Sequence, residues 1–127
     1  MHNNPGNFKD LKIWQKAMEL TMEIYSLVRL LPKEETYALS DQMRRAAVSI
    51  PSNIAEGQGR GSDKEFIQFL YFSRGSILEL STQLEICQKI GYITSTEAAK
   101  ASELITETCK MMQALIKYRK GCTGSSK

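Results

Sequence analysis

The sequence predicts an all-α protein, folded as an antiparallel up-down-up-down four-helix bundle in one domain over residues 8–120. Apolar residues recur at spacings of three and four along most of the 127 residues, which is the period of a helix buried on one face. Only three prolines occur, so long segments contain no helix breaker. Short stretches rich in turn residues separate four such segments, and short connections place successive helices antiparallel. We expect a flexible arm at residues 1–7 and a flexible tail at residues 121–127.

The first helix is expected over residues 10–31, with Asp10 as its N-cap. Pro32 ends this helix, because a proline disfavours the α conformation of the residue before it. Two apolar strips run side by side along the segment. The core strip contains Ile13, Ala17, Leu20, Ile24, Leu27 and Leu31, and the second strip contains Trp14, Met18, Met22 and Tyr25.

The second helix is expected over residues 37–57, and its inner face contains Leu39, Met43, Ala46, Ile50 and Ile54. Pro51 lies in the middle of this pattern and has no N–H to donate to the carbonyl of Ala47. We therefore predict a kink at Pro51, since Ile54 keeps the apolar strip in phase beyond it. Gly57 is expected to end the helix in the left-handed conformation.

The third helix is expected over residues 62–90. It begins with a capping box, in which Ser62 and Glu65 satisfy each other's backbone amides, and it ends at Gly91. Apolar residues lie on more than one face of this helix. Those outside its core strip are Ile67, Tyr71, Leu78 and Ile86.

The fourth helix is expected over residues 95–120, with Thr94 and Glu97 as a second capping box and Gly121 as its end. The net charge of the chain is +3, and residues 92–127 carry the whole surplus. A basic C-terminal end suits a polyanionic partner, although cations also stabilise the C-terminus of a helix without any partner.

Several classes of function are excluded by the residues that the chain contains. The only histidine is His2, so Ser-His and Cys-His nucleophiles, zinc sites and di-iron bundle sites are not expected. We therefore expect no enzyme, cofactor, metal or small-molecule substrate. The three cysteines have no paired spacing, which predicts a reducing, cytoplasmic location. No apolar run approaches the roughly 20 residues that cross a bilayer, so we expect no membrane partner.

Two sets of basic residues are candidates for binding nucleic acid. The first set contains Arg44, Arg45, Arg60, Lys64 and Arg74, and the second contains Lys117, Arg119 and Lys120. A solvated helix face explains such residues equally well, and no aromatic residues alternate with them in the stacking pattern of single-strand binders. The glycines of residues 57–62 suit either a phosphate-binding loop or a simple turn; no nucleotide-binding fingerprint surrounds them.

Three segments resemble a known family. Residues 42–57 read QMRRAAVSIPSNIAEG, residues 8–17 read FKDLKIWQKA, and residues 75–86 read GSILELSTQLEI. They are similar to the four-helix-bundle proteins encoded in intervening sequences of bacterial 23S rRNA genes. The resemblance implies an antiparallel four-helix bundle and ring-like homo-oligomers, with a pentamer as the expected form. The accessory protein of diversity-generating retroelements is also similar, and it contacts nucleic acid beside a reverse transcriptase.

The sequence thus predicts a non-catalytic, oligomeric helical scaffold whose partner is RNA or a ribonucleoprotein. The alternative is a protein–protein interaction module that binds no nucleic acid. Apolar residues beyond one core strip support a homo-oligomer, because a monomer should not expose a large apolar patch. These residues are Trp14, Tyr71, Leu78 and Ile86. The alternative is that a wide face of the bundle buries all four within one chain.

Overall fold

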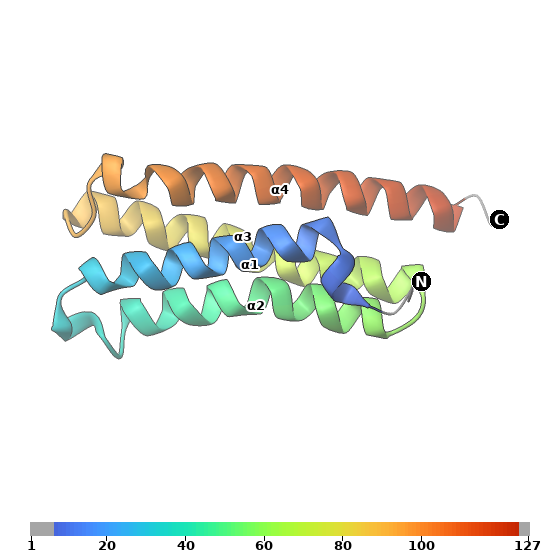
Figure 1. Ribbon diagram of the computed structural model, residues 1–127, viewed down its shortest axis with the longest axis horizontal. Coiled ribbons are helices and arrows are strands. Elements are labelled where there is room, and N and C mark those ends of the chain that lie inside the picture. Colours follow the sequence, from blue (N-terminus) through green and yellow to red (C-terminus); the bar gives the residue numbers. More distant parts are fainter. Residues whose placement is uncertain (1–6, 125–127) are drawn as a thin grey trace.

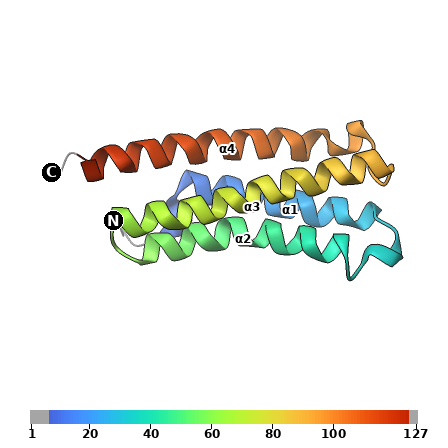
Figure 2. The ribbon, with the colours of Figure 1, turned by 180° about the vertical axis from the view of Figure 1, so that it is seen from behind.

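The computed structural model describes residues 7–124 and confirms the all-α four-helix bundle. Its long helices are α1 (Lys12–Leu27), α2 (Leu39–Gly59), α3 (Asp63–Ile90) and α4 (Ser95–Gly124), and no strand occurs in the described part. Successive helices run back and forth along the long axis, as Figures 1 and 2 show from opposite sides. In both views α4 extends past the turn between α2 and α3. Positions 1–6 of the predicted arm and 125–127 of the predicted tail lie outside the described residues, whereas residues 121–124, predicted as tail, belong to α4.

One core lies between the four helices. α1 packs on α2 and α4, and α3 packs on the same two helices. The predicted core strip of α1 is buried in full, and so is the predicted inner face of α2, apart from Leu39, which is partly buried. The strip of α1 ends as predicted, because Leu31 is extended, with ψ 149°, directly before Pro32.

α1 is shorter than predicted because 3₁₀ turns flank it. Phe8–Asp10 form one such turn, and the Asn7 side chain caps it by accepting a backbone N–H at 3.0 Å. The prediction of Asp10 as N-cap is therefore wrong, and α1 begins after Leu11, which makes no side-chain cap. The early turn brings the ring of Phe8 edge-on to Trp14, with 5.4 Å between centroids.

α2 runs through Pro51 without interruption, and hydroxyl groups from both neighbouring helices bind its backbone there. The Ala47 carbonyl, which Pro51 cannot reach with an N–H, lies 3.0 Å from the buried hydroxyl of Thr21 in α1. Ser73 in α3 donates to the Ile50 carbonyl at 2.9 Å. A buried carbonyl without a partner is costly, so the contact from Thr21, whose hydroxyl also lies 2.8 Å from the Ala17 carbonyl, helps to explain why the proline is tolerated. The kink at Pro51 stays a prediction.

Two of the predicted glycine helix ends are wrong. α2 continues past Gly57 to Gly59, and the left-handed residue of this turn is Gly61, with φ 85°. Gly57 is instead required by packing, because a Cβ there would lie 2.6 Å from the Cβ of Phe69. α4 continues through Gly121, which costs a helix about 1 kcal/mol relative to alanine but does not end it.

The helix ends predicted at Ser62, Gly91 and Thr94 are confirmed, whereas α2 begins at Leu39 and not at residue 37. The Ser62 hydroxyl oxygen accepts the Glu65 N–H at 3.2 Å, which caps α3. Thr94 and Glu97 form the full capping box of α4, with reciprocal bonds of 3.1 and 2.9 Å. Gly91 ends α3 in the left-handed conformation, with φ 98°.

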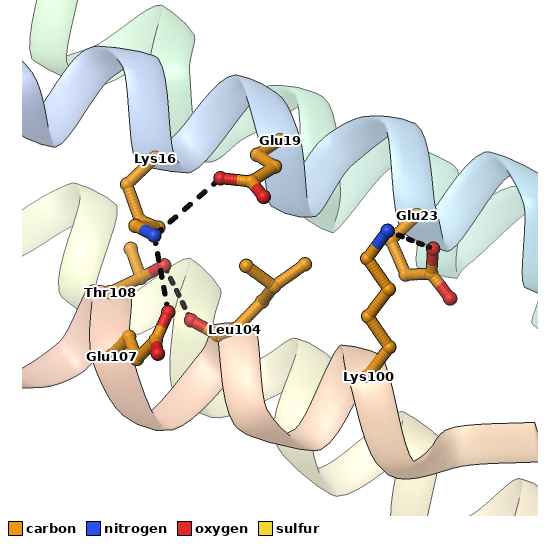
Figure 3. A network of polar contacts seen from close by, with 7 residues as sticks. All are labelled: Lys16, Glu19, Glu23, Lys100, Leu104, Glu107 and Thr108. Atoms are coloured by element: carbon orange, nitrogen blue, oxygen red, sulfur yellow. Dashed lines mark hydrogen bonds and ion pairs between the residues drawn. The ribbon is translucent and has the colours of Figure 1, made fainter.

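Ion pairs join α1 and α4 along their outer seam, as Figure 3 shows. Lys16 Nζ lies 3.1 Å from Glu107 Oε1, and Lys100 Nζ lies 3.9 Å from Glu23 Oε1. The hydrogen bond to Glu107 is the main cause that raises the pKa of Lys16 above its ordinary value. These partly exposed pairs help to set the register of α1 against α4 but contribute little to stability.

Candidate nucleic-acid interface

The bundle divides into two halves of opposite charge. The loop half surrounds the turn between α2 and α3 and consists of residues 8–19, 50–75 and 108–124. The far half consists of residues 20–49 and 76–107. The loop half carries ten Lys or Arg and five Asp or Glu, a net charge of +5, whereas the far half carries six and nine, a net charge of −3. The small net charge of the chain therefore conceals a strong separation, and a polyanion would be attracted to the loop half.

The first predicted set of basic residues is divided between the two halves. Arg44 and Arg45 lie near the start of α2, and the helical rise places them about 24 Å along the axis from Arg60. Both have local partners: the Arg44 guanidinium donates to the Thr36 carbonyl at 3.3 Å, and Arg45 pairs with Asp41 at 2.9 Å. The structure therefore does not bring these two arginines into one surface with the others.

Arg60 lies at the C-terminal end of α2, where a cation suits the helix dipole. Its guanidinium pairs with Glu56 at 2.9 Å, lies 3.9 Å from Glu65, and stacks 4.9 Å from the centre of the Phe69 ring. Lys64 follows in the first turn of α3 and is exposed. Neighbouring carboxylates thus compensate much of the charge of Arg60, whereas Lys64 is exposed to solvent.

Arg119 joins the end of α4 to the start of α3. Its guanidinium lies 2.6 Å from Asp63 Oδ1 and 4.8 Å from the centre of the Phe66 ring. These residues form one wall of a cavity of about 420 Å³ beside the glycines of the α2–α3 turn. Since Arg119 is engaged by Asp63 and Phe66, its first role is to hold the two helices together.

The structure brings Arg74 of α3 together with Lys117 and Lys120 of α4. The Arg74 guanidinium and the Lys120 ammonium each lie 5.1 Å from the centre of the Tyr71 ring. The three cations line a surface pocket of about 280 Å³, with Tyr71, Gln113 and Ile116 as the other lining residues. Members of the two predicted sets thus form one cluster, which the sequence did not show.

Aromatic rings accompany several of these cations, in contacts that were not predicted from the sequence. Four contacts between cations and rings occur in the loop half, on Phe66, Phe69 and Tyr71. Tyr71 and Arg74 are three residues apart on one helix, so this pair could have been found from spacing. The contacts of Tyr71 with Lys120 and of Phe66 with Arg119 join distant residues and depend on the fold.

The apolar residues that suggested self-association divide into two groups. Trp14 and Tyr71 are partly buried and pack against the core. Leu78 and Ile86 are 55% and 41% exposed, and Phe72 and Ile90 of the same helix are 50% and 56% exposed. Because 14 and 18 residues are about four and five helical turns, Phe72, Ile86 and Ile90 share one face of α3. We call these three residues the α3 strip.

Within residues 7–124, no group of three or more His, Cys, Asp or Glu side chains is arranged to hold a metal ion. None of the helices in this part of the chain combines the length and the apolar character that a membrane span needs.

The chain resembles known proteins over most of its length. The model of the family described as 23S rRNA-intervening sequence protein matches residues 9–114. A crystal structure from Bacteroides thetaiotaomicron, described as a protein with unknown function from the S23 ribosomal protein family, is similar with a TM-score of 0.76 and 27% identity. The similarity covers 83% of this chain and 98% of that chain. No curated protein matches the chain.

Proposed function

The chain belongs to the family of 23S rRNA-intervening sequence proteins, and from that premise we propose that it is a non-catalytic, oligomeric helical scaffold that binds RNA or a ribonucleoprotein through its loop half. The observation that carries the proposal is the charge separation, with +5 in the loop half and −3 in the far half. Such an asymmetry orients a polyanion toward one end of the bundle.

The contacts between cations and rings support this role of the loop half. A cation that rests on an aromatic ring is attracted by the ring and is restricted before any ligand arrives. Arg74 and Lys120 are held in this way on Tyr71. Their binding to a phosphate group therefore costs less side-chain entropy than the binding of a free lysine or arginine.

Self-association is the second part of the proposal. The α3 strip exposes apolar surface along one helix face, and burial of such surface favours association. A ring of copies would repeat each basic loop half, so weak contacts to one polyanion would add to a high avidity. The family resemblance makes a pentamer the expected form.

The proposal includes no reaction, cofactor or small-molecule substrate, because a single histidine, His2, restricts the nucleophile and metal chemistry that the chain could build. Cys87 and Cys109 are free cysteines. Free cysteines suit a reducing compartment, and we place the protein in the cytoplasm on that ground.

The direct test of RNA binding is a filter-binding titration with a structured RNA at low and moderate salt. We expect binding at low salt that weakens steeply, with a logarithmic slope that grows by about 0.7–0.9 for each phosphate contact. Absence of binding at low salt would contradict the RNA role and leave the second candidate, a protein–protein interaction module. The α3 strip is the observation that favours this second candidate.

Self-association is tested separately by light scattering. We expect an oligomer at micromolar concentration, and we expect Ile86→Glu to shift it toward the monomer because a charge would enter the buried interface. Tyr37→Glu is the matched control, since Tyr37 is 94% exposed and lies outside the α3 strip. A monomeric wild-type protein would overturn the oligomeric part of the proposal.

A further inference from the structure

Three cations of the loop half converge on one pocket without a carboxylate to neutralise them. Arg74, Lys117 and Lys120 line this pocket, and its other lining residues, Tyr71, Gln113 and Ile116, carry no negative charge. Within the described residues, no ion pair joins any of the three cations to a carboxylate. Like charges repel one another, so a pocket lined by three cations has an electrostatic surplus that an anion would remove.

The carboxylates of the same region are already engaged elsewhere. Glu56 and Glu65 pair with Arg60, and Asp63 pairs with Arg119. These pairs separate the loop half into cations that pair with a carboxylate and cations for which the described residues provide no carboxylate partner. Arg74, Lys117 and Lys120 belong to the second kind.

The chemistry of the lining residues fits a phosphate group. A guanidinium offers a planar pair of donors that matches two phosphate oxygens, and an ammonium offers a point charge with three donors. The side-chain amide of Gln113 adds a neutral donor at the same pocket. Tyr71 holds Arg74 and Lys120 in place, so it acts as a positioning residue.

A nucleobase fits this pocket less well than a phosphate. Stacking on Tyr71 would require the base to share the ring with Arg74 and Lys120, which already lie 5.1 Å from its centre. The donors in the pocket carry positive charge, which a phosphate compensates and a neutral base does not. Recognition here should therefore be independent of sequence.

We infer that the pocket formed by Tyr71, Arg74, Gln113, Lys117 and Lys120 binds a backbone phosphate of RNA, an assignment that rests on the proposed function and names its point of contact. Lys117 and Lys120 lie beyond residue 114, where the family match ends. The family match therefore covers Arg74 but neither Lys117 nor Lys120.

In the first test, the ¹⁵N-labelled full chain is titrated with inorganic phosphate, and the amide chemical shifts are measured by NMR at each phosphate concentration. We expect saturable shifts confined to the amides of residues 71–74 and 113–120, with little change around Lys33 and Lys89. Shifts spread evenly over all lysines, or no shifts at the pocket, would overturn the assignment.

The second test compares two triple variants with the same change in net charge. Arg74→Gln, Lys117→Gln and Lys120→Gln together remove the cations of the pocket, and Arg45→Gln, Lys89→Gln and Lys100→Gln together remove three exposed cations of the far half. We expect the pocket variant to bind structured RNA at least about tenfold more weakly at low salt, with a salt slope smaller by about two. The matched variant should retain most of the affinity.

The outcomes separate the pocket from the proposed function. If RNA binds the wild-type protein but both triple variants lose affinity equally, the pocket assignment is overturned and the RNA role stands. If the wild-type protein binds no RNA at low salt, the proposed function fails, and the assignment fails with it. Circular dichroism checks the fold of each variant, and the single change Lys117→Gln, at an exposed side chain, repeats the comparison if the triple variant unfolds.

Discussion

The loop half and the far half of the bundle differ in how their charged side chains are paired. In the far half Arg45, Lys89 and Lys100 are each paired with a carboxylate, and Tyr92 is bonded to Glu35 at 2.8 Å. In the loop half, carboxylates engage Arg60 and Arg119, while Arg74, Lys117 and Lys120 remain as a cationic surplus. The same fold thus has one half with a net charge of −3 and one half whose surplus cations are available to a partner.

The largest effect on stability is expected where the loop half is packed most tightly. Gly57→Ala would place a Cβ 2.6 Å from the Cβ of Phe69, so α2 and α3 would have to separate. We expect a loss of about 3 kcal/mol in the free energy of unfolding, measured in urea. Gly59→Ala is the matched control, because its Cβ would meet nothing within 4 Å. Equal effects of the two changes would show that close packing does not explain Gly57.

The next effect concerns the boundary between the halves, where Thr21 compensates for Pro51. Thr21→Val keeps the shape but leaves the Ala47 carbonyl without its cross-helix donor, which should cost roughly 2 kcal/mol. In a Pro51→Ala background the new backbone N–H can satisfy that carbonyl, so the same change should cost less. Urea unfolding of the four proteins gives the coupling, and strictly additive losses would contradict the compensation.

A smaller effect is expected from the ion pair that clamps the loop half. Asp63→Asn and Arg119→Gln, alone and together, should give a coupling of about 1 kcal/mol, since both side chains are partly exposed. The pair of Asp41 and Arg45 is the far-half control, and its coupling should be close to zero because Arg45 is 79% exposed. A larger coupling energy for Asp41 and Arg45 than for Asp63 and Arg119 would contradict the view that the structural ion pair lies in the loop half.

The smallest effect is expected for Tyr92→Phe, which removes the hydrogen bond between the two loops of the far half. That bond to Glu35 is the main cause that raises the pKa of Tyr92 above its ordinary value. A raised pKa in the folded state gives stability that is present below about pH 10 and is lost as the pH rises through the folded-state value. The melting temperature of the wild-type protein should therefore fall more steeply above pH 10 than that of the variant. Parallel curves of melting temperature against pH would contradict this expectation. The raised pKa of Lys16 cannot produce a difference between the curves, because Lys16 is present in both proteins.

The helices could be predicted from the sequence because their signals are local. Apolar spacing placed the core strips, and the capping boxes at Ser62 and Thr94 fixed two helix starts to within a residue. The ends at Gly57 and Gly121 were mispredicted, because a glycine signals a helix end and a close helix contact in the same way. Only the position of Phe69 distinguishes the two roles at Gly57.

The candidate site was predictable only in part. Every cation in the pocket was identified from composition, but Arg44 and Arg45 were grouped with residues that lie at the other end of the bundle. Which cations stay without a carboxylate depends on contacts across helices, such as that of Arg119 with Asp63, 56 residues earlier in the chain. Such pairs leave no periodic signal in the sequence.

The central claim is that the loop half faces RNA and the far half does not, and lysine footprinting tests it in one measurement. The full chain is labelled with an amine-reactive reagent, with and without structured RNA at low salt, and each lysine is quantified by mass spectrometry. We predict that RNA protects Lys64, Lys117 and Lys120, while Lys33, Lys89 and Lys100 react as in the free protein. Protection of the far-half lysines to the same or a greater degree would contradict the account.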